Sequence, residues 1–167
     1  MAQHYRLART HHSSIASAFV NKFRMSPFPH FLLLLDTNTV VSGLLWEGAS
    51  SVLLRAARER RLELFTSAAL LAELADVLPR AHFARKLAAA DLSVAQLVSR
   101  YALLAKQVIP ADIYAHIKDD PDDDAVLACA LAANADLIVS GDAHLRNLKH
   151  YRRIQIVNPA DAIKLIG

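Results

Sequence analysis

An unbroken apolar run, Phe31-Leu32-Leu33-Leu34-Leu35, constrains the fold more than any other feature of the sequence, and it ends directly in Asp36. A strand with one face in water alternates apolar and polar residues, whereas a continuous apolar run predicts a strand that is buried on both faces. Strands of this kind occur in parallel sheets that are covered by helices on both sides. We therefore predict that residues 31–36 form a central strand of an α/β protein.

Short apolar segments and amphipathic segments alternate along the rest of the chain. Further strands are predicted over residues 63–66, 108–109, 137–140 and 154–157. Helices are predicted over residues 50–61, 67–78, 81–90, 93–107, 121–134, 143–148 and 159–166. Because strands that alternate with helices favour parallel pairing, the predicted fold is a three-layer α/β/α sandwich with a central parallel sheet.

The first 29 residues differ from the remainder. They are rich in His and Ser, show no apolar period and end in Pro27 and Pro29. We expect residues 1–29 to be an N-terminal extension outside the fold and residues 30–167 to form one domain, since a chain of this length can bury a single sizeable core. Met25 offers an alternative start, so we expect residues 1–24 to be dispensable for folding.

Net charge does not identify a nucleic-acid partner. The formal charge is +3, but residues 1–24 hold four basic residues and no acidic one, and the remaining residues hold 15 basic and 16 acidic. An RNA-binding surface would need local basic patches instead. Two clusters are candidates: Arg55, Arg58, Arg60 and Arg61, and Arg80, Arg85 and Lys86. Each cluster is also explained by a solvated helix face.

The single cysteine, Cys129, lies in an apolar run and reads as a small core residue. It cannot form a disulfide within the chain, which indicates a reducing compartment. No apolar stretch reaches the roughly 18 residues that a membrane helix needs. We therefore expect a cytoplasmic location and no membrane association.

Two acids follow predicted strands. Asp36 comes directly after residues 31–35, and Asp142 follows Leu137-Ile138-Val139-Ser140-Gly141. In open parallel sheets, binding sites form at the carboxyl ends of the strands, so these two side chains are candidates for one cleft. Each acid could instead cap the helix that follows it, because Asp is a favoured cap and turn residue.

Further acids occupy helices. Glu73 lies at the edge of an apolar stripe and either faces the interior or reaches water. The densest charge is Asp119-Asp120-Pro121-Asp122-Asp123-Asp124, which opens a nearly all-apolar helix. Acids at a helix start are favoured by the helix dipole, yet five neighbouring carboxylates repel one another unless a cation neutralises them. Oxygen-only ligands suit Mg²⁺ or Mn²⁺ rather than zinc.

The pattern resembles the PIN-domain family. The resemblance rests on Leu34-Leu35-Asp36-Thr37-Asn38-Thr39-Val40-Val41-Ser42, on Glu73, on Asp122-Asp123-Asp124, and on Ala135-Asp136-Leu137-Ile138-Val139-Ser140-Gly141-Asp142. It covers about residues 31 to 160. It implies a parallel α/β/α sandwich that cleaves RNA with Mg²⁺ or Mn²⁺.

The resemblance also implies residue roles. It assigns catalysis and metal binding to Asp36, Glu73, Asp124 and Asp142, with Asn38 and Ser140 as supporting polar residues. Asp123 is the neighbouring alternative for the third acid. We favour Asp124 because it precedes Asp142 by eighteen residues, the separation expected from the family. Small bacterial members are often toxins, so a cognate antitoxin and a homodimer are expected partners besides RNA.

Two other functions are open at this point. A haloacid-dehalogenase-type phosphatase also places an Asp after a buried strand, but it needs a second Asp two residues later, where this chain has Asn38. A PIN-like domain could also bind RNA or a protein partner without cutting. The complete set of acids argues against that second alternative.

Overall fold

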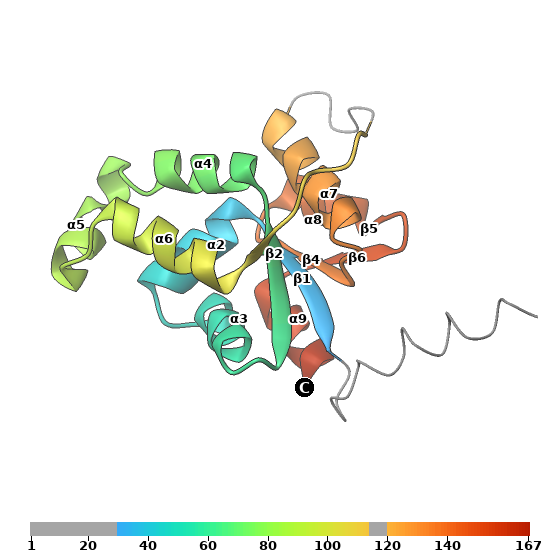
Figure 1. Ribbon diagram of the computed structural model, residues 1–167. Helices are drawn as coiled ribbons and strands as arrows, with labels where there is room; N and C mark the ends of the chain where they lie inside the picture. Colours follow the sequence, from blue (N-terminus) through green and yellow to red (C-terminus); the bar gives the residue numbers. More distant parts are fainter. Residues whose placement is uncertain (1–29, 114–119) are drawn as a thin grey trace, which may run out of the picture.

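A six-stranded sheet with strand order β3-β2-β1-β4-β6-β5 forms the centre of the computed structural model, which describes residues 30–113 and 120–167 (Figure 1). The strands are β1 (Phe31–Leu35), β2 (Leu62–Thr66), β3 (Lys106–Gln107), β4 (Leu137–Val139), β5 (His150–Tyr151) and β6 (Ile154–Val157). All neighbouring pairs are parallel except β5 with β6. The predicted parallel sheet is thus confirmed, and four of its strands lie where the sequence placed them. The strand predicted over residues 108–109 instead lies at Lys106–Gln107, inside the helix predicted over residues 93–107, because α6 already ends at Leu104. The antiparallel edge strand β5 was not predicted, because two residues carry too little apolar pattern to mark a strand.

Eight helices flank this sheet in the described part of the chain. They are α2 (Thr37–Leu45), α3 (Ala49–Arg58), α4 (Ala68–Val77), α5 (Ala81–Ala90), α6 (Val94–Leu104), α7 (Pro121–Ala132), α8 (Ala143–Leu148) and α9 (Pro159–Ile166). The sequence indicated all of them except α2, whose extent was not predicted. This helix begins directly after Asp36 without a connecting loop, and its β-branched Thr and Val residues are weak helix formers.

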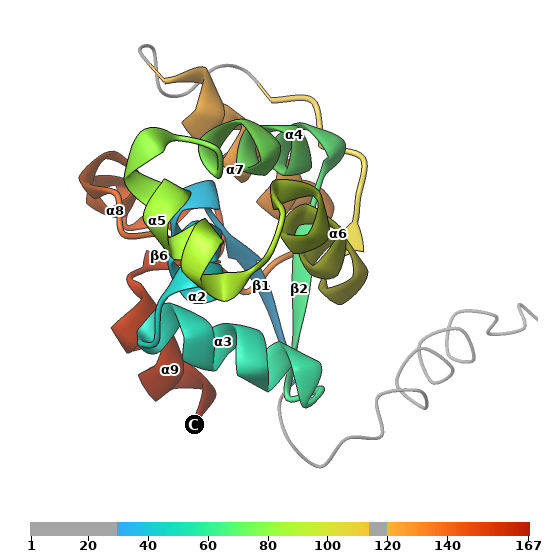
Figure 2. The same cartoon turned by 90° about the vertical axis from the view of Figure 1, so that its left-hand side faces the viewer.

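Strand β1 shows why the sheet has three layers. Its successive side chains alternate between the two faces, so Leu33 and Leu35 join one core and Leu34 joins the other. The first core packs beneath α2, α3, α4, α6 and α9, and the second beneath α7 and α8. Figure 1 shows the same division, with α2, α3, α4 and α6 on one side of β1 and α7 on the other, and in Figure 2 the first of these sides faces the viewer. The predicted α/β/α sandwich is confirmed.

The strand register places the candidate site. Leu35 pairs with Val139, and Val139 pairs with Val157, so β1, β4 and β6 end side by side. The Asp36 amide extends this pairing by donating to the Val139 carbonyl at 3.1 Å. Residues that directly follow β1 and β4 therefore meet at one edge of the sheet.

No single helix within residues 30–113 and 120–167 is long and apolar enough to cross a membrane; only α5 and α6 taken together, bent by 81°, reach the required length and composition. The predicted extension, residues 1–29, lies outside the described residues, as does Asp119 of the acidic run.

Candidate active site

A polar pocket of about 160 Å³ opens where β1 and β4 end. Its lining residues are Asp36, Thr37, Asn38, Glu73, Val77, Arg80, Asp120, Asp122, Asp123, Val126 and Asp142. Three of the four acids assigned from the sequence, Asp36, Glu73 and Asp142, thus lie around one pocket, together with Asn38. Asp36 directly follows β1, Glu73 lies in α4, and Asp142 follows β4, so the fold gathers them from distant parts of the sequence.

Asp36 is both a helix cap and a wall of the pocket. Its Oδ1 accepts a hydrogen bond from the Thr39 amide at 2.8 Å, at the start of α2. Its Oδ2 accepts one from the Ser140 hydroxyl. Burial raises the pKa of the Asp36 carboxyl, the hydrogen bonds from Ser140 and Thr39 partly oppose that rise, and the charge of Asp142 adds to it. The capping role and the site role therefore do not exclude each other.

Ser140 connects the two strand-end acids. It is completely buried, and its hydroxyl donates to Asp36 while accepting from the Asp142 amide at 2.9 Å. Asp142 in turn caps α8 by accepting from the His144 amide at 2.6 Å. Ser140 thus fixes the positions of both acids, which fits the supporting role assigned from the sequence.

Glu73 is held from across the pocket. The Thr37 hydroxyl donates to its Oε2 at 2.7 Å, and the side chain is half-buried. Burial raises the pKa of Glu73, the hydrogen bond from Thr37 lowers it, and the charges of Asp122, Asp36 and Asp120 raise it further. Glu73 therefore points into the pocket and is only partly exposed to water. Thr37 was missed from the sequence as a site residue, although its place directly after Asp36 is a signal that it shares the same edge.

The third acid needs a correction. Asp123 lines the pocket and is buried, whereas Asp124 is not among the lining residues. Asp120 caps α7 by accepting hydrogen bonds from the Asp122 and Asp123 amides at 3.1 and 3.4 Å. This cap fixes where the helix begins and therefore which of its side chains face the pocket. Since neighbouring helix residues point about 100° apart, only one of the pair can face the pocket. The structure thus places Asp123 on the pocket wall, where the spacing to Asp142 had favoured Asp124.

One carboxylate oxygen of Asp123 lacks a hydrogen-bond donor in the described part of the chain. This oxygen, Oδ2, is buried. Burial is the main reason that its pKa rises to about 6; the charges of Asp120, Asp142 and Asp36 add to the rise, and His144 opposes it. A buried, unpartnered carboxylate among other acids is costly unless a cation approaches it.

The chemistry of this donor set fits a hard divalent cation. The side chains are carboxylates, with hydroxyl and amide oxygens beside them, and such ligands suit Mg²⁺ or Mn²⁺. No three His, Cys, Asp or Glu side chains in the described residues lie close enough together to enclose a metal ion as they stand. Mg²⁺ does not need such a cage, because it commonly binds through one or two carboxylates and keeps several waters.

The raised pKa values predict how the metal-free protein responds to pH. A group whose pKa is higher in the folded state stabilises the fold fully below its unfolded pKa, near 3.9 for Asp, and this stabilisation is lost as the pH rises through the folded pKa. For Asp123 that window ends near its folded pKa of about 6. Unfolding in EDTA should therefore cost less free energy at pH 7 than at pH 4.5, by roughly 1 to 2 kcal/mol. Thermal melts of the parent and of Asp123→Asn across this range measure it. Equal slopes in the two proteins would contradict the expectation.

A comparison with known families agrees with this geometry. A family model described as a PIN domain matches residues 33–144, about two thirds of the chain, and that span includes Asp36, Glu73, Asp123 and Asp142. No curated protein gives a significant match.

Proposed function

The chain belongs to the PIN-domain family, whose members are generally nucleases, and from this premise we propose that it is a metal-dependent endoribonuclease that hydrolyses phosphodiester bonds of RNA with Mg²⁺ or Mn²⁺. The observation that carries the proposal is the unpartnered Oδ2 of Asp123, buried in a pocket with Asp36, Glu73 and Asp142. Ordinary helix caps would not leave a buried carboxylate oxygen without a donor.

Asp36, Asp123 and Asp142 are the candidate ligands: one or two of these carboxylates would bind the cation directly and the others would contact its bound waters, with Glu73 beside them. When bound, a divalent cation would supply Lewis-acid chemistry there, with positive charge to stabilise a phosphodiester and to favour ionisation of a water. The protein's own part is positioning. Ser140 keeps Asp36 and Asp142 in fixed orientation, and Thr37 keeps the Glu73 carboxylate turned into the pocket. Burial raises the pKa of Glu73, and this is the direction that suits a group that accepts and returns a proton.

Arg80 supplies the positive charge of the pocket. It lies at the start of α5, is exposed, and makes no ion pair with any acid in the described part of the chain. A guanidinium at the rim of an acidic pocket is suited to bind a phosphate group in two-pronged geometry. We expect Arg80→Ala to lower kcat/KM for RNA about ten-fold, because one charged phosphate contact is lost.

The matched control for Arg80→Ala is Arg85→Ala, which removes the same charge from an exposed position of the same helix outside the pocket. Steady-state cleavage of a labelled RNA oligonucleotide measures both variants, with Arg80→Lys expected in between. Similar losses for Arg80→Ala and Arg85→Ala would mean that only the overall charge of α5 matters.

The decisive experiment for the proposal is cleavage of single-stranded RNA by the purified protein. Cleavage should require added Mg²⁺ or Mn²⁺ and should stop when EDTA is added. Metal-dependent binding of RNA without cleavage would favour the alternative, a PIN-like domain that binds RNA but does not cut it.

The finer parts of the proposal rest on the family resemblance. We propose that the protein is the toxin of a toxin–antitoxin pair in the cytoplasm and that it forms a homodimer. Co-purification with the product of a neighbouring gene tests the first part, and light scattering at micromolar concentration tests the second. If the protein is monomeric and co-purifies with no product of a neighbouring gene, both the toxin–antitoxin proposal and the homodimer proposal are contradicted.

A further inference from the structure

A second pocket, of about 380 Å³, lies beside the carboxylate pocket and shares Asn38 and Asp142 with it. Its lining residues are Asn38, Thr39, Ser42, Ser50, Gly141, Asp142 and Pro159. From Asn38 and Asp142 the first pocket extends to residues of α4 and α7, and the second extends to residues of α3 and α9. A chain-like substrate that passes over Asp142 would therefore occupy both.

The second pocket differs from the first in its chemistry. Its walls carry three hydroxyls and one amide, and Asp142 is its single carboxylate. It is also formed by the first turns of three helices, with Thr39 in α2, Ser50 in α3 and Pro159 in α9. Helix starts carry partial positive charge and favour anions. A negatively charged group is thus repelled far less here than among the six acids of the first pocket.

Ser50 adds a hydroxyl to this pocket from α3. The residue is 8% exposed and lines the pocket. The Thr39 hydroxyl, in contrast, contributes to the hydrogen bonding of Asp36. A serine hydroxyl that lines a polar pocket can donate to a ligand there and accept from it.

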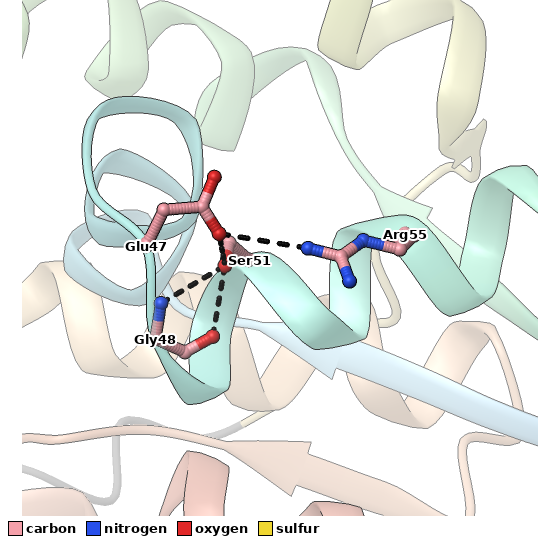
Figure 3. A network of polar contacts seen from close by, with 4 residues as sticks. All are labelled: Glu47, Gly48, Ser51 and Arg55. Carbon is pink, nitrogen blue, oxygen red and sulfur yellow. Dashed lines mark hydrogen bonds and ion pairs between the residues drawn. The ribbon is translucent and has the colours of Figure 1, made fainter.

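Ser50 follows a turn that has hydrogen bonds of its own. Figure 3 shows them: the Ser51 hydroxyl accepts from the Gly48 amide at 3.0 Å and donates to the Gly48 carbonyl at 2.8 Å, while Arg55 reaches the Glu47 carboxylate at 3.5 Å. These contacts order the turn that precedes Ser50. A site that is ordered in advance loses less entropy when it binds its ligand.

We propose that this second pocket, the Ser50 pocket, binds the sugar–phosphate backbone of the RNA nucleotide next to the scissile phosphate. The proposal rests on the nuclease function proposed above and extends it by naming the surface that holds the neighbouring nucleotide. Hydroxyl and amide side chains typically contact phosphate and sugar oxygens. Bases of single strands are instead held on aromatic rings, and none of the lining residues is aromatic. The contact is therefore to the backbone and is independent of base identity.

Gly141 offers a clean test, because its surroundings tolerate a side chain. A Cβ added there meets no atom within 4 Å, and its backbone is not in the left-handed region. At Gly43, by contrast, a Cβ would lie 2.9 Å from Leu54 Cδ1 and from the Ser50 carbonyl oxygen. Substituting Gly141 therefore changes the pocket without straining the fold.

The experiment measures binding of a fluorescent single-stranded RNA 12-mer by anisotropy, with Mg²⁺, in an Asp36→Asn background. Gly141→Arg, Gly141→Gln and Gly141→Glu add side chains of similar length and different charge. The Kd should rise in the order Arg, Gln, Glu, with about ten-fold between the extremes, and this difference should shrink at high salt. The control pair is Leu103→Arg and Leu103→Glu at an 89% exposed position at the opposite end of the sheet, where the Kd should change about two-fold or less.

Ser50→Ala supplies a second variant that adds no bulk and leaves every acid in place. It should raise the Kd about three- to ten-fold, as expected for one lost hydrogen bond, and equally for oligonucleotides of different base composition. A charge order that is the same at Gly141 and Leu103, or an unchanged Kd in Ser50→Ala, overturns the proposal. If the parent cuts RNA but the Gly141 and Ser50 variants bind it as the parent does, the Ser50 pocket proposal fails and the nuclease proposal stands. If the variants differ in Kd as expected but the parent never cuts RNA, the nuclease proposal fails and the pocket still binds RNA.

Discussion

Asp36→Asn is expected to lower kcat/KM for RNA cleavage about 1,000-fold while leaving the protein as stable as the parent or more stable, since a ligand of the catalytic cation is lost but no packing changes. Asn is as good a helix cap as Asp, so the bond from the Thr39 amide can be kept. The substitution also removes a buried negative charge whose pKa is already raised by burial. Activity and stability should therefore move in opposite directions.

Cleavage assays and thermal melts on the same preparations measure this result. The parent should melt at a higher temperature when Mg²⁺ or Mn²⁺ is added, because a ligand that binds only the folded state stabilises it. Asp36→Asn should show a smaller rise. If the variant still cuts RNA and still responds to Mg²⁺, the carboxylate pocket is not the catalytic site.

The second large effect is a contrast between neighbours. Asp123→Asn should lower RNA cleavage about 100-fold, because its orphaned oxygen is the one best placed to receive a cation. Asp124→Asn should keep most of the activity, since Asp124 does not line the pocket. The two variants share their chemistry and their helix turn, so each is the matched control of the other.

Metal-free melts add a readout that does not depend on catalysis. Asp123→Asn should be more stable than the parent at neutral pH in EDTA, because it removes a carboxylate whose pKa is raised to about 6. Asp124→Asn should give no such gain. A loss of activity in Asp124→Asn with full activity in Asp123→Asn would reassign the third acid of the site to Asp124.

The layers and the strand-end acids could be predicted from the sequence because both depend on local pattern. The run at residues 31–35 predicts a strand with two buried faces, and an acid directly after such a strand can only lie at the sheet edge. Asp36 and Asp142 were found in this way. Helix α2 was harder to predict, because tertiary packing against α3 and α4 stabilises a segment of weak helix formers.

Other parts of the site depend on information that local pattern does not carry. The choice between Asp123 and Asp124 depends on where α7 begins, and a shift of one residue reverses it. The bond from Thr37 to Glu73 and the place of Arg80 at the rim depend on how α4 packs against α2. The Ser50 pocket joins four segments that are separate in the sequence, and no motif links them.

The bond between Ser140 and Asp36 joins residues that are 104 positions apart. A ribosome that makes this chain releases Asp36 and Glu73 long before it has added β4 and Asp142. Until β4 pairs beside β1, the early acids have neither the serine that orients them nor the fourth carboxylate. An unfinished chain therefore cannot carry the assembled site. If the pocket cuts RNA as proposed, the order of synthesis delays that activity until the last third of the polypeptide has folded.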